Sequence, residues 1–406
     1  MGLKMAEIKV PFHKAAITKA EEDAVLDVLR SGWLTTGRYA LEFEKKFSRA
    51  VGSTDERPII SLAVNSNTSG MILAMEACGV KEGTAVITTP YTFVSTAACA
   101  RHLNADVYFA DVEKDSYNID PDKIEEILKK DAEGEKKIVA IVPVHIAGNV
   151  CKMKRILELA EKYSEAGRKI RVIEDAAHSF PSPTGLGYAG TIGDAGVFSF
   201  YVTKTITTAE GGMVCTRDPE LARRMTVMRL HGMDRTTWDR YTSPRASWEY
   251  DIIAPGYKFN LPDVLAAIGS CQVDRAQLFY EQRKGIVEKY NESFSKLDFI
   301  QLPPDGEGNA WHLYLMRIVP EKLKIGRDAF AKKMQEAGLG ISVHFIPIFH
   351  FTYWRELYPD FTAQAYPNAE RQYQATISIP LYPDMTEEEA QLVIDTVKQI
   401  GAENHA

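Results

Sequence analysis

The stretch Val197-Phe198-Ser199-Phe200-Tyr201-Val202-Thr203-Lys204-Thr205 carries an apolar run, predicted to be a buried strand, with an amine just beyond its end. Upstream, a second apolar run over 170–173 ends in Glu174-Asp175-Ala176-Ala177-His178. Open α/β sheets bind ligands at the carboxyl ends of their strands, so we expect Lys204 and Asp175 to lie near one site. Taken singly, Lys204 could be a solvated lysine and Asp175 a helix or turn cap.

This pair of residue types suits one cofactor chemistry. A lysine that forms a Schiff base and an acid that keeps a pyridine nitrogen protonated are the minimum that pyridoxal 5′-phosphate (PLP) requires. A lysine with the reference pKa of about 10.4 is almost fully protonated at pH 7, so a nucleophilic lysine needs desolvation or a nearby cation. The apolar strand end would desolvate Lys204. The sequence therefore predicts a PLP site on Lys204 and Asp175.

Length and composition limit the other possibilities. A chain of 406 residues, 45% of them apolar, should divide into two domains, which we place at 1–255 and 256–406. The net charge of −7 is spread along the chain, which argues against a nucleic-acid partner. Five cysteines without a C-x-x-C pair favour neither disulfides nor a metal site, and fit a cytoplasmic protein. We expect no membrane segment, because no apolar run reaches 18 residues and 1–7 lacks an apolar leader.

Short apolar runs alternate with helical patterns over the first 220 residues. This alternation predicts an α/β fold, a mostly parallel sheet covered by helices, followed by a smaller α+β domain. The first part should contain strands at 85–88, 106–109, 138–142, 172–173, 197–200 and 211–216, and helices near 69–79, 122–130 and 154–166. The second part should contain a helical region near 262–296, strands at 312–318 and 341–343, a helix at 327–337, and a last helix opened by the capping box Thr386-x-x-Glu389.

Polar groups gather where the predicted strands end. Asn65-Ser66-Asn67-Thr68-Ser69-Gly70 opens a helix, where hydroxyls and free N–H groups suit a phosphate, although Thr68 or Ser69 could simply cap the helix. Strand alternation places Ser199 opposite Phe198 and Phe200, so this buried hydroxyl needs a partner that a phosphate could provide. Aromatic residues in 89–93 could stack on a pyridine ring or pack in the core.

Three further patterns have simpler explanations. His145 and His178 each follow a strand; a single histidine there is commonly structural, but two on one rim of the sheet favour a site. Residues 185–190 match G-x-G-x-x-G, but neither a strand before nor a helix after them is predicted, so we expect a hairpin or loop and no dinucleotide site. Glu174 and Asp175 should point to opposite faces of their strand, which makes them unsuitable as a paired acid and base.

Six motifs, taken in order, resemble the DegT/DnrJ/EryC1/StrS sugar aminotransferases over about residues 8 to 400. The motifs are 31–37, 67–70, 174–178, 198–200, 204–212 and 256–260. Within that family the chain looks most like the UDP-4-amino-4-deoxy-L-arabinose:oxoglutarate aminotransferases, through 310–313, 344–345 and 353–356. The resemblance implies a fold type I PLP-dependent transferase, a homodimer with shared active sites, that moves an amino group from glutamate to a keto group of a nucleotide-linked sugar in polysaccharide or lipopolysaccharide biosynthesis.

The resemblance also assigns roles to residues of this chain. It implies that Lys204 is the Schiff-base lysine, that Asp175 pairs with the pyridine nitrogen, and that Phe93 stacks on the ring. The remaining cofactor contacts that it implies are His178, the phosphate-binding Thr68, Ser69 and Ser199, and Asn260 of the partner subunit. Candidate substrate residues from the resemblance alone are Trp33, Trp311 and His344.

The chain departs from the family where His13-Lys14-Ala15-Ala16 replaces an Arg-Pro pair, and at Arg38 and Thr205. A PLP-dependent sugar dehydratase would need histidine at position 204, and a non-catalytic PLP-binding regulator should have lost Lys204 or Asp175. An aminotransferase acting on a keto cyclitol would share every cofactor residue, so the sequence leaves that alternative open.

Overall fold

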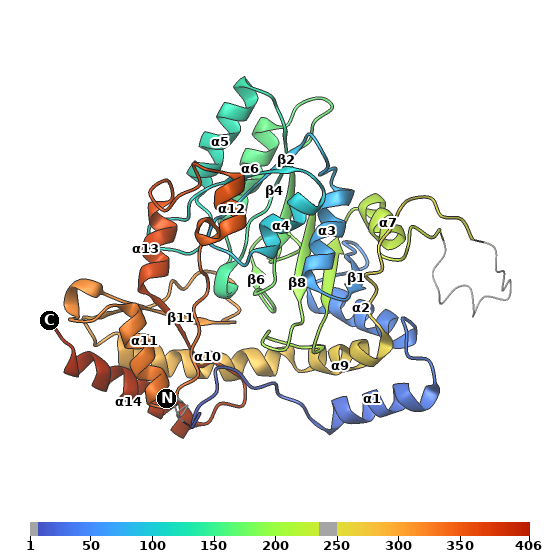
Figure 1. Ribbon diagram of the computed structural model, residues 1–406. Helices are drawn as coiled ribbons and strands as arrows, with labels where there is room; N and C mark the ends of the chain where they lie inside the picture. Colours follow the sequence, from blue (N-terminus) through green and yellow to red (C-terminus); the bar gives the residue numbers. More distant parts are fainter. Residues whose placement is uncertain (1–6, 235–249) are drawn as a thin grey trace.

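The computed structural model describes residues 7–234 and 250–406. The prediction that residues 1–7 form no apolar leader falls mostly on residues 1–6, which lie outside the described residues. Figure 1 shows a central sheet with helices on both sides and a smaller group of C-terminal elements beside it. Helices α9 (Asp263–Asp274) and α10 (Ala276–Phe294) lie end to end along the base of both parts in this view.

A seven-stranded sheet forms the centre of the larger part. Its strands lie in the order β1-β9-β8-β5-β4-β2-β3, and β9 alone among them runs antiparallel to its neighbours. The mostly parallel α/β sheet predicted from the sequence is therefore confirmed. The strands are β1 (Ile60–Val64), β2 (Ala85–Thr88), β3 (Asp106–Phe109), β4 (Ile138–Ile141), β5 (Arg171–Asp175), β8 (Ala195–Ser199) and β9 (Gly212–Thr216).

Helices cover both faces of this sheet, because its strands are apolar on both sides. One face packs against α3 (Asn67–Ala77), α4 (Ser95–His102) and α7 (Pro219–Met228). The other face packs against α2 (Arg38–Ala50) and α9 at one end and α5 (Pro121–Glu133) and α6 (Met153–Tyr163) at the other. Helix α1 (Lys19–Ser31) lies beside α9, beyond the sheet.

Strand β8 shows how the alternation of side chains builds the two cores. Val197 packs under α3 with Met71 and Leu73. Phe198 lies on the other face, where its ring centroid is 4.9 Å from that of Phe47 on α2. Side chains of successive residues therefore point to opposite faces, as the sequence predicts. Ser199 follows Val197 and faces the same side as the start of α3.

The C-terminal part is a small α+β unit. Its antiparallel sheet has the order β10 (Ile300–Gln301), β11 (Tyr314–Ile318) and β12 (Thr376–Ile379). The helices around it are α11 (Arg327–Glu336), α12 (Thr352–Leu357), α13 (Pro367–Ala375) and α14 (Glu387–Glu403), and the capping box at Thr386 and Glu389 is present. The strand predicted at 341–343 is wrong: the backbone of Ser342 pairs once with Ser378, and the chain then leaves the sheet towards the cavity described below.

The division of the chain at residue 255 stays a prediction. Helix α9 shares an apolar cluster with β8 and β9 of the large sheet, through residues such as Ala266 and Phe198. Ile286 and the residues after it on α10 belong to the cluster of the smaller part. The chain thus passes from the core of the large part to the core of the smaller part within α9 and α10, downstream of the boundary predicted at residue 255.

Residues 183–188 form the two-stranded hairpin β6 (Pro183–Thr184) and β7 (Gly187–Tyr188), so the prediction of a hairpin at the glycine pattern is confirmed. Over residues 7–234 and 250–406, no helix combines the length and apolar character needed to cross a membrane. The same residues contain no group of three His, Cys, Asp or Glu side chains able to hold a metal ion.

Candidate active site

A cavity of about 420 Å³ opens at the carboxyl ends of β5 and β8, where the sequence places Asp175 and Lys204. This volume lies in the range of about 300–1,000 Å³ that is usual for small-molecule sites. The cavity joins the large sheet to the smaller part of the molecule, which contributes His312, His344 and Phe345. Its other lining residues include Ser66, Asn67, Thr68, Thr92, Phe93, Ser95, Asp175, His178, Ser199, Tyr201, Lys204 and Glu210.

Lys204 lies in the loop after β8, where its backbone N–H donates to the carbonyl of Tyr201 at 2.9 Å. Burial lowers the pKa of its amine from 10.5 to about 8, and the nearby Asp175 carboxylate acts in the opposite direction. Burial dominates because the charged amine loses more hydration than a single carboxylate returns. The amine is therefore far easier to deprotonate near neutral pH than an exposed lysine.

Asp175 ends β5 and is buried, with 4% of its surface exposed. The hydroxyl of Thr96 donates to its Oδ2 at 2.8 Å, and the backbone N–H of Ala177 donates to Oδ1 at 3.2 Å. The amide of Asn67 lies 3.4 Å from Oδ1. Burial raises the pKa of Asp175, whereas these three donors and the charge of Lys204 lower it. The carboxylate is thus held by neutral donors and can serve as counter-ion to a cation in the cavity.

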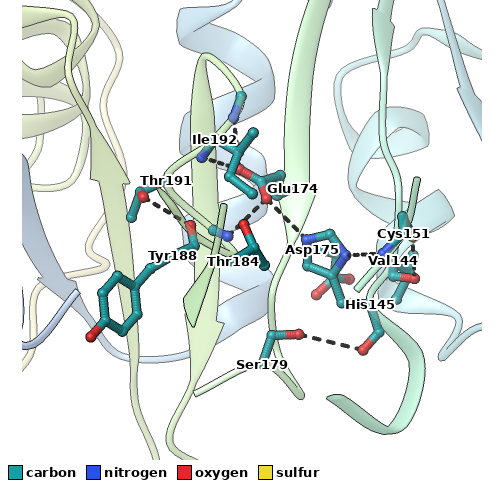
Figure 2. Close-up of polar contacts among 12 residues, drawn as sticks. Val144, His145, Cys151, Glu174, Asp175, Ser179, Thr184, Tyr188, Thr191 and Ile192 are labelled. Atoms are coloured by element: carbon teal, nitrogen blue, oxygen red, sulfur yellow. Dashed lines mark hydrogen bonds and ion pairs between the residues drawn. The ribbon is translucent and has the colours of Figure 1, made fainter. Parts of the chain in front are cut away.

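Glu174 points away from the cavity, as alternation predicts. Figure 2 shows its carboxylate between the loop at Ile192 and the ring of His145. It accepts hydrogen bonds from the backbone N–H groups of Gly190, Ile192 and Gly193 at 2.7–2.8 Å and lies 2.9 Å from Nε2 of His145. Both side chains of this pair have no exposed surface. Glu174 therefore anchors the end of β5 to the 190–193 loop and His145 on one face of the sheet, while Asp175 faces the cavity on the other.

Three histidines form one wall of the cavity. His178, after β5, and His312, before β11, have ring centroids 4.5 Å apart. His344 contacts Ser378 through Nδ1 at 2.8 Å. Burial is the main cause that lowers the pKa of all three rings, to about 4 for His344 and well below 6.5 for the others. The wall is therefore built of neutral imidazoles.

His312 was not among the residues predicted for the site. It belongs to the motif 310–313, in which the family resemblance named the neighbouring Trp311 as the candidate substrate residue. The sequence signal that could have indicated His312 is a polar side chain at the start of the strand predicted at 312–318. Thr96 was also missed, because an ordinary threonine in the first turn of a helix shows nothing of its contact with Asp175.

The start of α3 forms another part of the cavity lining, through Ser66, Asn67 and Thr68. Ser66, rather than Thr68 or Ser69, caps the helix, and its Oγ accepts the N–H of Ser69 at 3.1 Å. Thr68 and Ser199 line the cavity. Gly212 of β9 allows this close approach, because a Cβ there would lie 2.7 Å from the backbone nitrogen of Asn67.

Four residues predicted for the site do not line this cavity. The hydroxyl of Ser69 donates to Asn65 at 2.5 Å beneath the helix start. Trp33 donates through its indole N–H to the carbonyl of Thr36 at 3.2 Å.

Trp311 is buried and its ring stacks on that of Tyr314, with centroids 6.5 Å apart. The amide of Asn260 donates to the hydroxyl of Thr36 at 2.6 Å. Trp311 therefore belongs to the packing of the smaller part, and Asn260 is held by its own chain outside the cavity.

The DegT/DnrJ/EryC1/StrS aminotransferase family model matches residues 15–398. The chain belongs to this family. It is 37% identical over 394 residues to the spore coat polysaccharide biosynthesis protein SpsC of Bacillus subtilis, covering 96% of this chain and 97% of that one. A sugar aminotransferase, Spr1654, of Streptococcus pneumoniae, solved in its pyridoxamine phosphate form, has a TM-score of 0.87 at 29% identity, covering 97% and 100% of the two chains. The aminotransferase PseC of Helicobacter pylori, involved in pseudoaminic acid biosynthesis, has a TM-score of 0.84 at 25% identity, covering 97% and 99%.

The protein is thus a fold type I, PLP-dependent aminotransferase, and the cavity fits that cofactor. An amine with a lowered pKa and a buried carboxylate face one space of suitable volume. Hydroxyls at the start of α3 and the exposed ring of Phe93 lie around the same space. Each chemical group that PLP requires is present: an amine, an acid, phosphate donors and an aromatic face.

Proposed function

We propose that the protein transfers the amino group of glutamate to a keto group of a nucleotide-linked sugar. The single observation that carries the proposal is the placement of Lys204 and Asp175 on one buried cavity, the amine with a lowered pKa. When bound, PLP acts as the electron sink that lets a proton leave the α-carbon of the amino donor. The relatives named for polysaccharide and pseudoaminic acid biosynthesis support a sugar as the acceptor.

We assign the cofactor contacts as follows. Lys204 would bond to the aldehyde carbon, and Asp175 would accept the pyridine N–H. Phe93, with 59% of its surface exposed, would stack on the ring, and His178 would contact the cofactor. Thr68 and Ser199 would hold the phosphate, and Ser69, whose hydroxyl donates to Asn65 outside the cavity lining, stays a proposed contact.

Lys204 has two tasks in this proposal. Its neutral amine would be the nucleophile towards the cofactor aldehyde, and the same amine would accept and return the proton of the α-carbon of the amino donor. A pKa of about 8 suits both tasks, because general acid–base catalysis is most effective near the working pH.

The experiment that tests the function separates its two half-reactions. Purified protein loaded with PLP and mixed with glutamate should lose its visible absorption and yield pyridoxamine phosphate. Lys204→Ala should lose steady-state turnover while still binding pyridoxamine phosphate, and Lys204→Arg should behave alike because its cation stays protonated. Steady-state transamination retained by Lys204→Ala would refute the assignment of the lysine.

A panel of keto sugar nucleotides and keto cyclitols tests the acceptor. We expect the nucleotide-linked sugars to restore the absorption and the free cyclitols not to. A cyclitol that restores it alone would establish the alternative acceptor. Failure of glutamate to change the spectrum at all would favour a non-catalytic, PLP-binding regulator.

We also propose a homodimer in which Asn260 of the partner subunit reaches the phosphate. The described surface near the cavity carries exposed apolar side chains, including Tyr201, Val202 and Ile346, which a second copy could cover. Mixing Lys204→Ala with Asn260→Ala protein after subunit exchange should restore about a quarter of wild-type activity, because each mixed dimer regains one intact site. No recovery would show that Asn260 acts only inside its own chain.

Two finer expectations remain proposals. The likeness to the UDP-4-amino-4-deoxy-L-arabinose enzymes rests partly on Trp311 and Trp354, which are both buried in packing outside the cavity lining, so we propose the nucleotide sugar class without that subtype. All five cysteines are free in the described structure, which fits the proposed cytoplasmic location.

A further inference from the structure

The turn at 145–148 lies directly behind the cavity and contacts three of its residues through the backbone. The backbone N–H of Ala147 donates to Nδ1 of His178 at 3.1 Å. The carbonyl of Ala147 accepts the N–H of His312 at 2.9 Å. The N–H of His145 donates to the carbonyl of Asp175 at 3.2 Å. One short segment therefore joins two of the three wall histidines, His178 and His312, to the end of β5.

Ala147 adopts a backbone conformation that is uncommon for a residue with a Cβ. Its φ is +60°, in the left-handed region, and Gly148 follows with a φ of +98°. Left-handed conformations of non-glycine residues cost energy and persist only where surrounding contacts impose them. In this conformation the N–H of Ala147 donates to the ring of His178, and its carbonyl accepts the backbone N–H of His312.

The buried His145–Glu174 pair holds this turn in place. Nδ1 of His145 accepts the backbone N–H of Cys151 at 3.1 Å, which leaves Nε2 as the donor to Glu174, 2.9 Å away. Ser179 donates through its hydroxyl to the carbonyl of His145 at 3.5 Å (Figure 2). Every polar atom of the two side chains has a partner, so the pair has one low-energy arrangement.

We propose that the 145–148 turn, held by His145 and Glu174, is a positioning element that fixes His178 as the tautomer with its proton on Nε2. A nitrogen that accepts an N–H cannot carry a proton, so Nδ1 of His178 is the unprotonated atom. The remaining nitrogen, Nε2, is then a permanent donor on the cavity wall. The group of the ligand that meets it must be a hydrogen-bond acceptor, such as an oxyanion or a keto oxygen.

His145, Glu174 and Ala147 act in this scheme through His178 and touch no ligand. The inference adds to the proposed function but can fail separately, because the tautomer of His178 is read without any substrate. The property to measure is which ring nitrogen of His178 carries the proton.

Solid-state ¹⁵N NMR on full-length protein labelled at histidine, with PLP bound and after its removal, gives this answer. His178→Asn identifies the resonances of His178. At pH 7 the wild-type protein should show an unprotonated Nδ1 and a protonated Nε2. A wild-type ring protonated on Nδ1 overturns the proposal.

Variants test the role of the turn. His145→Leu removes both ring contacts, and we expect His178 to populate both tautomers and kcat to fall on the order of 100-fold, with a smaller change in KM for glutamate. Ala147→Val should act in the same direction because a β-branched side chain opposes a φ of +60°, whereas Ala147→Gly keeps the N–H and the conformation and should preserve the wild-type spectrum.

A folded His145→Leu or Ala147→Val protein with an unchanged His178 spectrum overturns the role of the turn. If His145→Leu does not fold, the comparison of Ala147→Val with Ala147→Gly decides. A changed spectrum in Ala147→Gly contradicts the proposal as well, because that variant retains every contact invoked here.

Discussion

The hydroxyl of Thr96 donates a hydrogen bond of 2.8 Å to Oδ2 of Asp175, and both side chains are buried. The proton of this hydroxyl is thereby committed to Asp175, so the contact of 3.0 Å between Thr92 and Thr96 must have Thr92 as its donor. Thr92, in the loop before α4, thus donates to Thr96 in the first turn of α4, and Thr96 donates to Asp175. This chain of hydrogen bonds ends on the carboxylate assigned to the pyridine nitrogen.

We predict that Thr96→Val weakens cofactor binding by about 10- to 100-fold, the effect of losing a hydrogen bond to a charged group of about 1.5–3 kcal/mol. The pKa of Asp175 should rise further, since the lost contact is the strongest that opposes its burial. Equilibrium dialysis of PLP measures the change. Thr96→Ser retains the donor and should bind PLP almost as wild type, so equal losses in the two variants would contradict the prediction.

Lys204→Met should stabilise the cofactor-free protein at pH 7. The pKa of Lys204 is about 8 when folded and 10.5 when unfolded, so the unfolded chain binds more protons between these values. Stability of the wild type therefore rises with pH through this window, and the variant lacks that rise. We expect a difference of at most about 3 kcal/mol at pH 7, shrinking above pH 8. Urea unfolding at pH 7 and 9.5 measures it, and a constant difference would show that the lysine is not the cause.

Gly212→Ala should destabilise the protein and reduce PLP affinity. A Cβ at this position would lie 2.7 Å from backbone atoms of Ser66 and Asn67, so the start of α3 would have to move. Gly285→Ala is the matched control, because Gly285 lies within α10 with no atom near its missing Cβ. We expect Gly285→Ala to raise the free energy of unfolding by about 0.5–1 kcal/mol. Thermal melts with and without PLP would measure both effects: the melting temperature should fall, and rise less on adding PLP, in Gly212→Ala but not in Gly285→Ala.

His344→Asn should reduce the acid sensitivity of the cofactor-free protein. Burial lowers the pKa of His344 from 6.5 to about 4, so its folded form binds fewer protons than its unfolded form between these values. This ring therefore costs stability as the pH falls from 6.5 towards 4. Unfolding measured across that range should show a shallower pH slope in the variant. An identical slope would assign the acid sensitivity to other groups.

The large sheet could be predicted from sequence because its central strands are short continuous apolar runs, which parallel sheets require on both faces. The predicted bounds of 85–88 and 106–109 agree with β2 and β3. Strands β1 and β12 were missed, because serine and threonine interrupt their apolar character. The strand predicted at 341–343 has the right residue types, but only its central residue pairs with the sheet.

The cavity could be predicted in part for a related reason. Lys204, Asp175 and His178 follow strands that end at one edge of the sheet, so their proximity follows from the fold class. His312 reaches the cavity from the smaller part of the molecule, so only the packing of the two parts brings it there. Thr96 contacts Asp175 from α4, far away from it in sequence, and does so behind the cavity lining. Trp311 shows the converse: its neighbour His312 lines the cavity, but the Trp311 indole is buried in the core of the smaller part.

The lowered pKa of Lys204 has a practical consequence for studying the molecule. In the cofactor-free protein, an amine that is already partly neutral near pH 7.5, inside a cavity of about 420 Å³, should react with small aromatic aldehydes well before the exposed lysines do. Borohydride trapping would then attach one reporter group per chain at a known position. Such single-site tagging would let fluorescence follow subunit exchange without introducing any new cysteine.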